Sequence, residues 1–284
     1  MRILTLIEDT RTSKKLQCEQ GLSFYIELNG NVILMDTGAS GQFIKNAEKL
    51  GVDLKSTAEL YCVISHNHDD HTGGLDALLK LRPDVQIFAR KAVAGSYYRR
   101  VGPLNVAVER NASFFEKHGK NLCLFESFQE IVDGFYVMGC EVFDEKFILR
   151  DKRLLMREGK KLVPDDFKHE IFAVAFPTPE DKSKGCVVIS SCSHNGIINI
   201  LETVKRTWSE SPILGVVGGF HMDGVAGAVG IGDGYIKRVA AELSERSQGC
   251  VYTCHCTGEK AYERFKAYMG DQIQTLRTGE ELKF

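Results

Sequence analysis

Three histidines and an aspartate lie within six residues in the first third of this chain. They are His66, His68, Asp70 and His71. Because side chains at positions i and i+2 of an extended segment point the same way, His66 and His68 could hold one cation together. Asp70 and His71, beyond a turn, could face a second position close by. Neutral imidazole and carboxylate are ordinary ligands of zinc and similar divalent metals, so this spacing predicts a metal site rather than a polar surface loop.

The sequence around this cluster indicates which elements carry it. An apolar run, Leu60–Ile64, precedes the cluster and is typical of a buried strand. Gly73 and Gly74 follow it, and then Leu75 and Leu78 recur at helical spacing. The four side chains are therefore expected on a loop at the end of a strand, which is where open α/β sheets place their sites.

Alternation and periodicity predict further elements along the chain. Asn29-Gly30, between two strand-like runs, indicates a tight hairpin turn. The middle of the chain, from about residue 104 to residue 180, is typical of short strands and charged turns. An antiparallel, hairpin-rich first half followed by alternating strands and helices predicts an α/β (α+β) protein with sheets covered by helices. Helices are expected over residues 43–50, 92–100, 197–208, 235–246 and 260–268.

The pattern His66-x-His68-x-Asp70-His71 resembles the metal-binding signature of the metallo-β-lactamase superfamily. This resemblance implies more than periodicity does. It implies a four-layer αββα sandwich of the metallo-β-lactamase type, with metals in a cleft at one edge of the two sheets. It also implies a single domain over residues 1–284.

Asp36-Thr37-Gly38 follows another buried strand, and its aspartate has two possible roles. The tripeptide is similar to the Asp-Thr-Gly of aspartic proteases, which need two such carboxylates sharing a proton. The chain has one copy, so a protease would require a dimer and would leave the histidine cluster unexplained. In metallo-β-lactamase relatives the same place holds a buried aspartate that supports the metal loop. We therefore expect Asp36 to orient ligands rather than to perform catalysis.

Two later loops follow the same order of buried strand, histidine and helix. Cys192 and His194 are at i and i+2 and can share a face. His194 is expected to bind the first metal. Cys192 lies where many relatives carry a bridging aspartate, so it is either a thiolate ligand or a buried inert thiol. His255 is the natural last ligand, for the second metal.

The resemblance has one departure. The separate histidine that the superfamily usually supplies between the first cluster and the aspartate strand has no clear counterpart here. Either His194 replaces it, or the first metal site is under-coordinated.

Other histidines and cysteines are assigned different roles. His221 follows Gly218-Gly219 and is expected to be a metal ligand, a general acid or a substrate contact, with a plain surface histidine as the alternative. Cys254 and Cys256 point away from His255 if the strand continues through them, which predicts packing roles. Their spacing does not match a zinc knuckle. Two histidines are expected to be structural, and these are His118 and His169.

Composition limits the classes of partner. The chain has 284 residues, 43% of them hydrophobic and 26% charged, and a net charge of −2, which is ordinary for a globular protein with a sizeable core. This net charge does not favour binding to nucleic acid or to an anionic membrane. The sequence has no run of about 18 apolar residues, so no membrane helix is predicted. Nine cysteines without disulfide spacing predict free thiols and a cytoplasmic location. The expected partner is a small-molecule substrate, with the oligomeric state left open.

More segments narrow the resemblance to one branch of the superfamily. This branch contains predicted metal-dependent hydrolases together with an archaeal 7,8-dihydropterin-6-methyl-4-(β-D-ribofuranosyl)aminobenzene 5′-phosphate synthase. The similarity spans nearly the whole chain. The segments that carry it are residues 19–24, 36–38, 192–194, 218–221 and 255–258.

The resemblance implies a metal-dependent hydrolase that uses a metal-activated hydroxide at a dinuclear site on an ester, lactone or phosphodiester. The expected cofactor is a pair of divalent metal ions. Zn²⁺ is the expected metal, and Fe and Mn are the alternatives. Asp70 would bind the second metal and orient the hydroxide or accept its proton. His221 would donate a proton or hold the leaving group.

Two alternative functions stay open. One is a synthase-type transferase acting on dihydropterin and aminobenzene ribosyl phosphate, in which the cations would bind phosphate or diphosphate. A phosphate-bearing substrate would need basic contacts, which Ser96–Arg100 and Arg150–Lys161 could supply, although each is more often a solvated surface. The other is a non-catalytic metal-binding or sensing domain, whose site would be closed by protein ligands.

Overall fold

The computed structural model describes residues 1–57, 59–110, 112–223 and 231–284. The chain divides into two compact units, each built from separated stretches of sequence. The expectation of a single domain over residues 1–284 stays a prediction. The first unit comprises Met1–Ser127, Asp151–Ile171 and Arg277–Lys283, and the second comprises Phe128–Arg150, Phe172–Leu276 and Phe284.

The first unit is built on a seven-stranded sheet in the order β18-β1-β2-β3-β4-β5-β8. The strands from β18 to β3 are antiparallel, and those from β3 to β8 are parallel. The predicted hairpin turn joins β2 to β3, with Asn29 and Gly30 both at positive φ, as a type I′ turn requires. The strands are β1 (Arg2–Ile7), β2 (Ser23–Leu28), β3 (Asn31–Met35), β4 (Leu60–Val63), β5 (Gln86–Arg90), β8 (Leu122–Phe125) and β18 (Glu281–Lys283).

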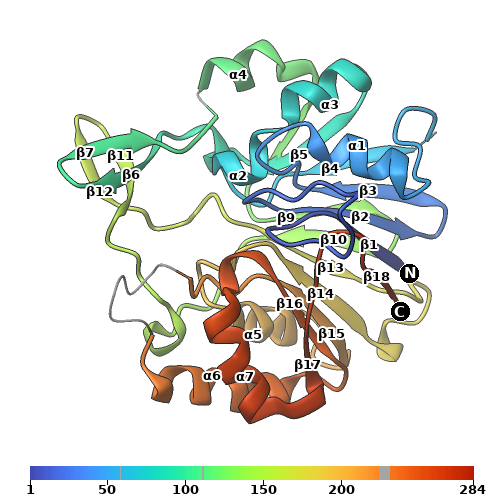
Figure 1. The fold of residues 1–284 in the computed structure, drawn as a ribbon, viewed down its shortest axis with the longest axis vertical. Helices are drawn as coiled ribbons and strands as arrows, with labels where there is room; N and C mark the ends of the chain where they lie inside the picture. The colour runs from blue at the N-terminus through green and yellow to red at the C-terminus, as the bar shows by residue number, and fades with distance from the viewer. Residues whose placement is uncertain (58, 111, 224–230) are drawn as a thin grey trace. The chain divides into compact units, whose positions relative to one another are not determined.

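Three helices cover one face of this sheet, namely α1 (Gln42–Lys49), α3 (Leu75–Leu81) and α4 (Ala112–Lys117) (Figure 1). Each buries a narrow apolar stripe, as helices on a core do. In α1 the stripe includes Phe43 and Ala47, four residues apart. These side chains join the sheet residues in one hydrophobic cluster, which excludes water from the strands that carry the candidate site.

A small antiparallel sheet, in the order β12-β11-β6-β7, also belongs to the first unit. The helix expected over residues 92–100 is wrong, because only a short 3₁₀ turn, η1 (Lys91–Ala94), precedes β6. Tyr97, Tyr98 and Val101 favour a pleated surface, and β11 supplies the partner strand. The strands are β6 (Tyr97–Val101), β7 (Leu104–Ala107), β11 (Leu154–Glu158) and β12 (Lys161–Pro164).

The second unit has its own seven-stranded sheet, in the order β17-β16-β15-β14-β13-β10-β9. The strands β14 to β17 are parallel, and β14 is buried at every position, as a continuous apolar run predicts. The strands are β9 (Phe128–Val132), β10 (Phe135–Met138), β13 (Phe172–Ala175), β14 (Cys186–Ser190), β15 (Ile213–Gly218), β16 (Val251–Thr253) and β17 (Ile273–Thr275).

Three helices of the second unit pack on one face of that sheet (Figure 1). They are α5 (Ile197–Thr207), α6 (Asp233–Arg246) and α7 (Glu259–Met269), which confirms the three helices predicted in this half. Within the described ranges, no helix has the length and apolar character needed to cross a membrane. The described residues also form short 3₁₀ turns: η2 (Gly119–Asn121), η3 (Glu145–Phe147), η4 (Lys182–Lys184), η6 (His255–Thr257) and η7 (Gly270–Gln272).

Candidate metal centre

The histidine cluster of the first unit lies at the carboxyl ends of two neighbouring parallel strands. Asp36 directly follows β3, and the cluster follows β4 after two residues. The second half of the cluster is helical rather than a loop, because α2 (Asp69–Thr72) begins after His68. Such a strand edge is where parallel sheets collect side chains for a site.

The structure brings the four predicted ligands of this segment together. The ring of His66 lies 4.5 Å from that of His68 and 4.3 Å from that of His71, between centroids. His71 Nε2 is 3.7 Å from Asp70 Oδ1. His66 and His71 are fully buried, and His68 is 8% exposed. Three buried imidazoles and the partly exposed carboxylate of Asp70 therefore lie close together.

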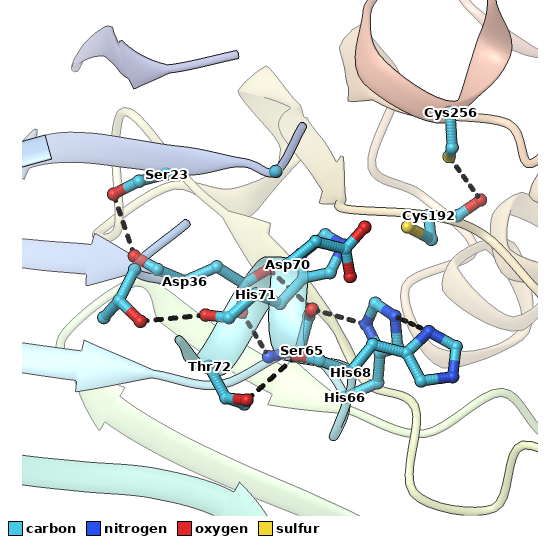
Figure 2. Close-up of polar contacts among 12 residues, drawn as sticks. Ser23, Asp36, Ser65, His66, His68, Asp70, His71, Thr72, Cys192 and Cys256 are labelled. Carbon is cyan, nitrogen blue, oxygen red and sulfur yellow. Dashed lines mark hydrogen bonds and ion pairs between the residues drawn. The ribbon is translucent and has the colours of Figure 1, made fainter. Parts of the chain in front are cut away.

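Asp36 sets the tautomers of two of these rings through a chain of hydrogen bonds (Figure 2). Ser65 Oγ donates its single proton to Asp36 Oδ2 at 2.6 Å, so it must accept from His66 Nδ1 at 2.8 Å. Asp36 Oδ2 also accepts from His71 Nδ1 at 2.7 Å. Both rings then carry a proton on Nδ1, and in the neutral form of each ring Nε2 keeps the lone pair that binds a metal.

The donor set fits a divalent cation. Burial lowers the pKa of His68 to about 3, so this imidazole is neutral at physiological pH. His66 Nε2 and His68 Nδ1 are 3.1 Å apart. Two nitrogens on one tetrahedral zinc ion, each about 2.0–2.1 Å from it, would be about 3.3 Å apart. These two nitrogens are thus spaced almost as one cation would require.

Two glycines allow this packing. Thr37 N and Thr37 Oγ1 both donate to His71 O, at 2.8 Å and 2.9 Å, which holds the Asp36 turn against α2. A Cβ on Gly73 would lie 2.1 Å from Ala39 O, and one on Gly74 would lie 2.3 Å from Thr37 O. Only glycine leaves room for the two backbones at this distance.

Reasoning from the sequence missed a second group beside the cluster. Ligand-type atoms of His68, Asp165 and His169 all lie within 4.8 Å of one another, and all three residues are buried. Burial alone raises the pKa of Asp165, but the hydrogen bond and the electrostatic interaction with His169 bring it below its ordinary value. No spacing signal could have shown this group, because His169 contacts Asn67 across 102 residues of sequence.

The candidate residues of the second unit also lie at the carboxyl ends of adjacent parallel strands. Cys192 and His194 follow β14, His221 follows β15, and His255 follows β16. The rings of His194 and His221 are 4.0 Å apart between centroids. His221 is partly exposed, whereas the other three are buried. The second unit therefore gathers its own predicted ligands at one edge of its sheet.

Each of these three loops holds a residue other than glycine in the left-handed region. The φ angles of Ser193, His221 and His255 are 59°, 47° and 49°. Such conformations cost of order 1–3 kcal/mol each and persist where surrounding bonds fix them. Here Ser193 Oγ donates to Gly219 O at 2.7 Å, and Cys256 O accepts two backbone N–H groups at 2.8 Å. Strain of this kind concentrates at functional sites, which supports these loops as candidates.

A packing role was predicted for Cys256, but its sulfur atom contacts polar backbone groups. Its Sγ accepts the backbone N–H of His221 at 3.3 Å and lies 3.7 Å from Cys192 O (Figure 2). Burial would raise the pKa of Cys256, but its hydrogen bonds with Cys192 and His221 and the charges of His255 and His221 bring it well below the ordinary value. The strand alternation behind the prediction fails because β16 ends at Thr253 and a 3₁₀ turn follows.

Comparison with known proteins shows which proteins the chain resembles. Residues 16–127 match the family model of the metallo-beta-lactamase superfamily. Over 301 aligned residues the chain is 28% identical to the 7,8-dihydropterin-6-methyl-4-(beta-D-ribofuranosyl)-aminobenzene-5'-phosphate synthase of Methanocaldococcus jannaschii, with 100% of this chain and 97% of that protein covered. The sequence similarity therefore extends well beyond the histidine cluster.

Solved structures give the fold. The crystal structure of Tm1679, a metal-dependent hydrolase of the beta-lactamase superfamily, is 28% identical with a TM-score of 0.79, and the match covers 100% of this chain and 99% of that one. YhfI from Bacillus subtilis, a metallo-beta-lactamase fold protein, has a TM-score of 0.57 at 11% identity, covers 99% of this chain and 98% of that one, and shows the fold alone. The mixed α/β fold predicted from the sequence is confirmed. The match over residues 16–127, the full-length similarity and the shared fold together make this chain similar to proteins of the metallo-β-lactamase superfamily.

Proposed function

We propose that this protein is a metal-dependent hydrolase acting on an ester, a lactone or a phosphodiester. The observation that carries the proposal is the hydrogen-bond chain through which Asp36 and Ser65 hold the Nδ1 atoms of His66 and His71. Hydrogen bonds of this kind to the second ring nitrogen are what orient metal-ligating histidines. The similarity to a named metal-dependent hydrolase supports the same reading.

The proposed cofactor is a pair of divalent metal ions, which we propose to be Zn²⁺, with Fe or Mn as alternatives. When bound, such ions supply Lewis acidity and lower the pKa of water enough to make it a nucleophile near neutral pH. In the first unit the proposed ligands are His66, His68, Asp70 and His71. In the second unit, Cys192, His194 and His255 stay the ligands that the sequence predicts.

Two residues are proposed for proton transfer. Asp70 is part-exposed, with 21% of its side chain accessible, so its carboxylate can orient water or accept a proton. Among the described residues, His221 Nε2 is a buried atom without a hydrogen-bond partner. Such an atom suits a metal or a substrate oxygen. The proposed role of His221 is to protonate or hold the leaving group.

The test combines metal analysis with a substrate screen. The purified protein is expected to contain divalent metal and to cleave at least one member of a panel of esters, lactones and phosphodiesters. His68→Ala should lose bound metal and turnover while its circular dichroism stays that of the parent. His118→Ala is the matched control, because His118 contacts Phe114 and lies outside the clusters. A His68→Ala protein that turns over at the full rate would contradict the proposal.

A transferase of the synthase type is the second candidate. Similarity over the full chain to a named synthase favours it. The structure also pairs the two basic stretches, since β6 lies beside β11 and the guanidinium of Arg157 donates to Tyr98 OH at 2.8 Å. A paired basic surface of this kind could contact a phosphate-bearing substrate.

The two candidates give opposite outcomes in one assay. Condensation of a dihydropterin with an aminobenzene ribosyl phosphate, without cleavage of any ester in the panel, would select the synthase. Metal binding with neither activity would select the non-catalytic metal-binding or sensing domain instead.

A further inference from the structure

Asp165 and His169 form a buried pair beside the metal loop, and no role in metal binding was predicted for either. His169 Nε2 is 3.2 Å from Asp165 Oδ2. On the other side of the ring, His169 Nδ1 accepts the backbone N–H of Asn67 at 3.0 Å. Asn67 is the residue between the two candidate ligands His66 and His68. The pair therefore touches the loop at the point that sets the spacing of those ligands.

The hydrogen bonds define the protonation of the ring. A backbone N–H can only donate, so His169 Nδ1 must carry the lone pair. In the neutral ring the proton is then on Nε2 and is donated to Asp165. Both nitrogens are occupied, and a cation on His169 would need a second lone pair that the neutral ring lacks. With these hydrogen bonds in place, the geometry favours a positioning role for Asp165 and His169.

Neighbouring groups hold the pair and the loop rigidly. The ring of Tyr97 lies 3.9 Å from that of His169, and the ring of Phe167 stacks at 5.6 Å, between centroids. The side chain of Asn67 donates to Val93 O at 2.6 Å and accepts from the backbone N–H of Arg110 at 2.9 Å. Asn67 is thus fixed by its side chain, and His169 fixes its backbone.

The same segment also contacts the loop on the other side of His66. Ile171 N donates to Ser65 O at 2.7 Å. Residues 165–171 therefore hold the loop at two points, and Asp165 lies within 4.8 Å of a ligand-type atom of His68.

We propose that Asp165 and His169 are positioning residues of the metal loop, which fix the Asn67 amide and through it the spacing of the His66 and His68 nitrogens. The role in metal affinity rests on the proposed function, whereas the geometry of the loop does not.

Two amide substitutions of His169 separate its two hydrogen bonds. In His169→Asn the side-chain oxygen occupies the place of Nδ1 and can still accept from Asn67. In His169→Gln the amide reaches the place of Nε2, so it keeps the contact with Asp165 and loses the one with Asn67. The affinity for the first equivalent of Co²⁺, followed by visible absorption, should fall about 10- to 100-fold in His169→Gln and less than about threefold in His169→Asn. Equal losses in the two variants, or no loss in His169→Gln, would overturn the proposal.

Two measurements do not depend on metal. Long-range ¹H–¹⁵N spectra of the metal-free parent protein should show the His169 proton on Nε2, and a proton on Nδ1 would refute the pair even if no variant folds. The Asn67 amide should exchange with solvent faster in His169→Gln than in His169→Asn. If the parent protein binds no Co²⁺ while both results hold, the proposed function fails and the positioning of the loop stands.

Discussion

At the scale of single residues, Asp36 is the group on which the other side chains of the cluster depend. Its carboxylate accepts hydrogen bonds from Ser65 N, Ser65 Oγ and His71 Nδ1. The Ser65 hydroxyl in turn contacts His66 Nδ1, so Asp36 also orients the His66 ring. We expect Asp36→Asn to lower metal affinity about 10- to 100-fold, because an amide nitrogen cannot accept these bonds. Competition with a chromophoric chelator measures the affinity, with His118→Asn as the control. Unchanged affinity in Asp36→Asn would show that the tautomers are set by other groups.

A second prediction at this scale concerns acid. The pKa of His68 is about 3 in the folded protein and about 6.5 in the unfolded chain, so between these values the unfolded state binds more protons. The free energy of unfolding of the metal-free protein should therefore fall as the pH is lowered from about 6.5 toward 3. Urea unfolding from pH 7 to pH 5 measures the slope, and His68→Gln should make it shallower. An identical slope in parent and variant would rule out His68 as its source.

At the scale of elements, the close approach of α2 and α3 to the Asp36 turn depends on Gly74. A Cβ there would lie 2.3 Å from Thr37 O and 2.6 Å from Ser40 O. Gly74→Ala should lower the free energy of unfolding by about 1–3 kcal/mol, as overpacking of a tight site does. Gly234→Ala, in α6 with open space around it, is the matched control and should be neutral or slightly stabilising. Equal stability of the two variants in urea would contradict the packing argument.

The elements also show what the sequence could and could not predict. The helices α5, α6 and α7 and the Asn29-Gly30 hairpin follow from local periodicity and turn chemistry, and the structure has them. The strand β6 was predicted as helix because its pairing with β11 is formed by residues more than fifty positions away.

The candidate site shows the same limit. The spacing of His66, His68, Asp70 and His71 within one short segment made that cluster visible in the sequence. The positioning of Asn67 by His169 has no local signal, since only the fold brings the two residues together.

At the scale of the whole molecule, the predicted ligands are divided between the two units. We expect His255→Asn to lower the metal content per chain, because the sequence predicts that this residue binds the second ion. Asparagine suits the test, since it tolerates the left-handed backbone found there. Inductively coupled plasma analysis of purified protein measures the content, against His118→Asn. Full metal content in His255→Asn would confine metal binding to residues other than His255.

The pairing of β1 with β18 has a consequence for synthesis on the ribosome. Arg2 pairs with Lys283, and Leu4 pairs with Glu281. The strand β1 is therefore synthesised almost three hundred residues before its partner β18. Until residues 281–283 emerge from the exit tunnel, β1 has an open edge that another chain could occupy. The first sheet, and the histidine loop that it carries, can reach its final form only after translation of that segment is complete.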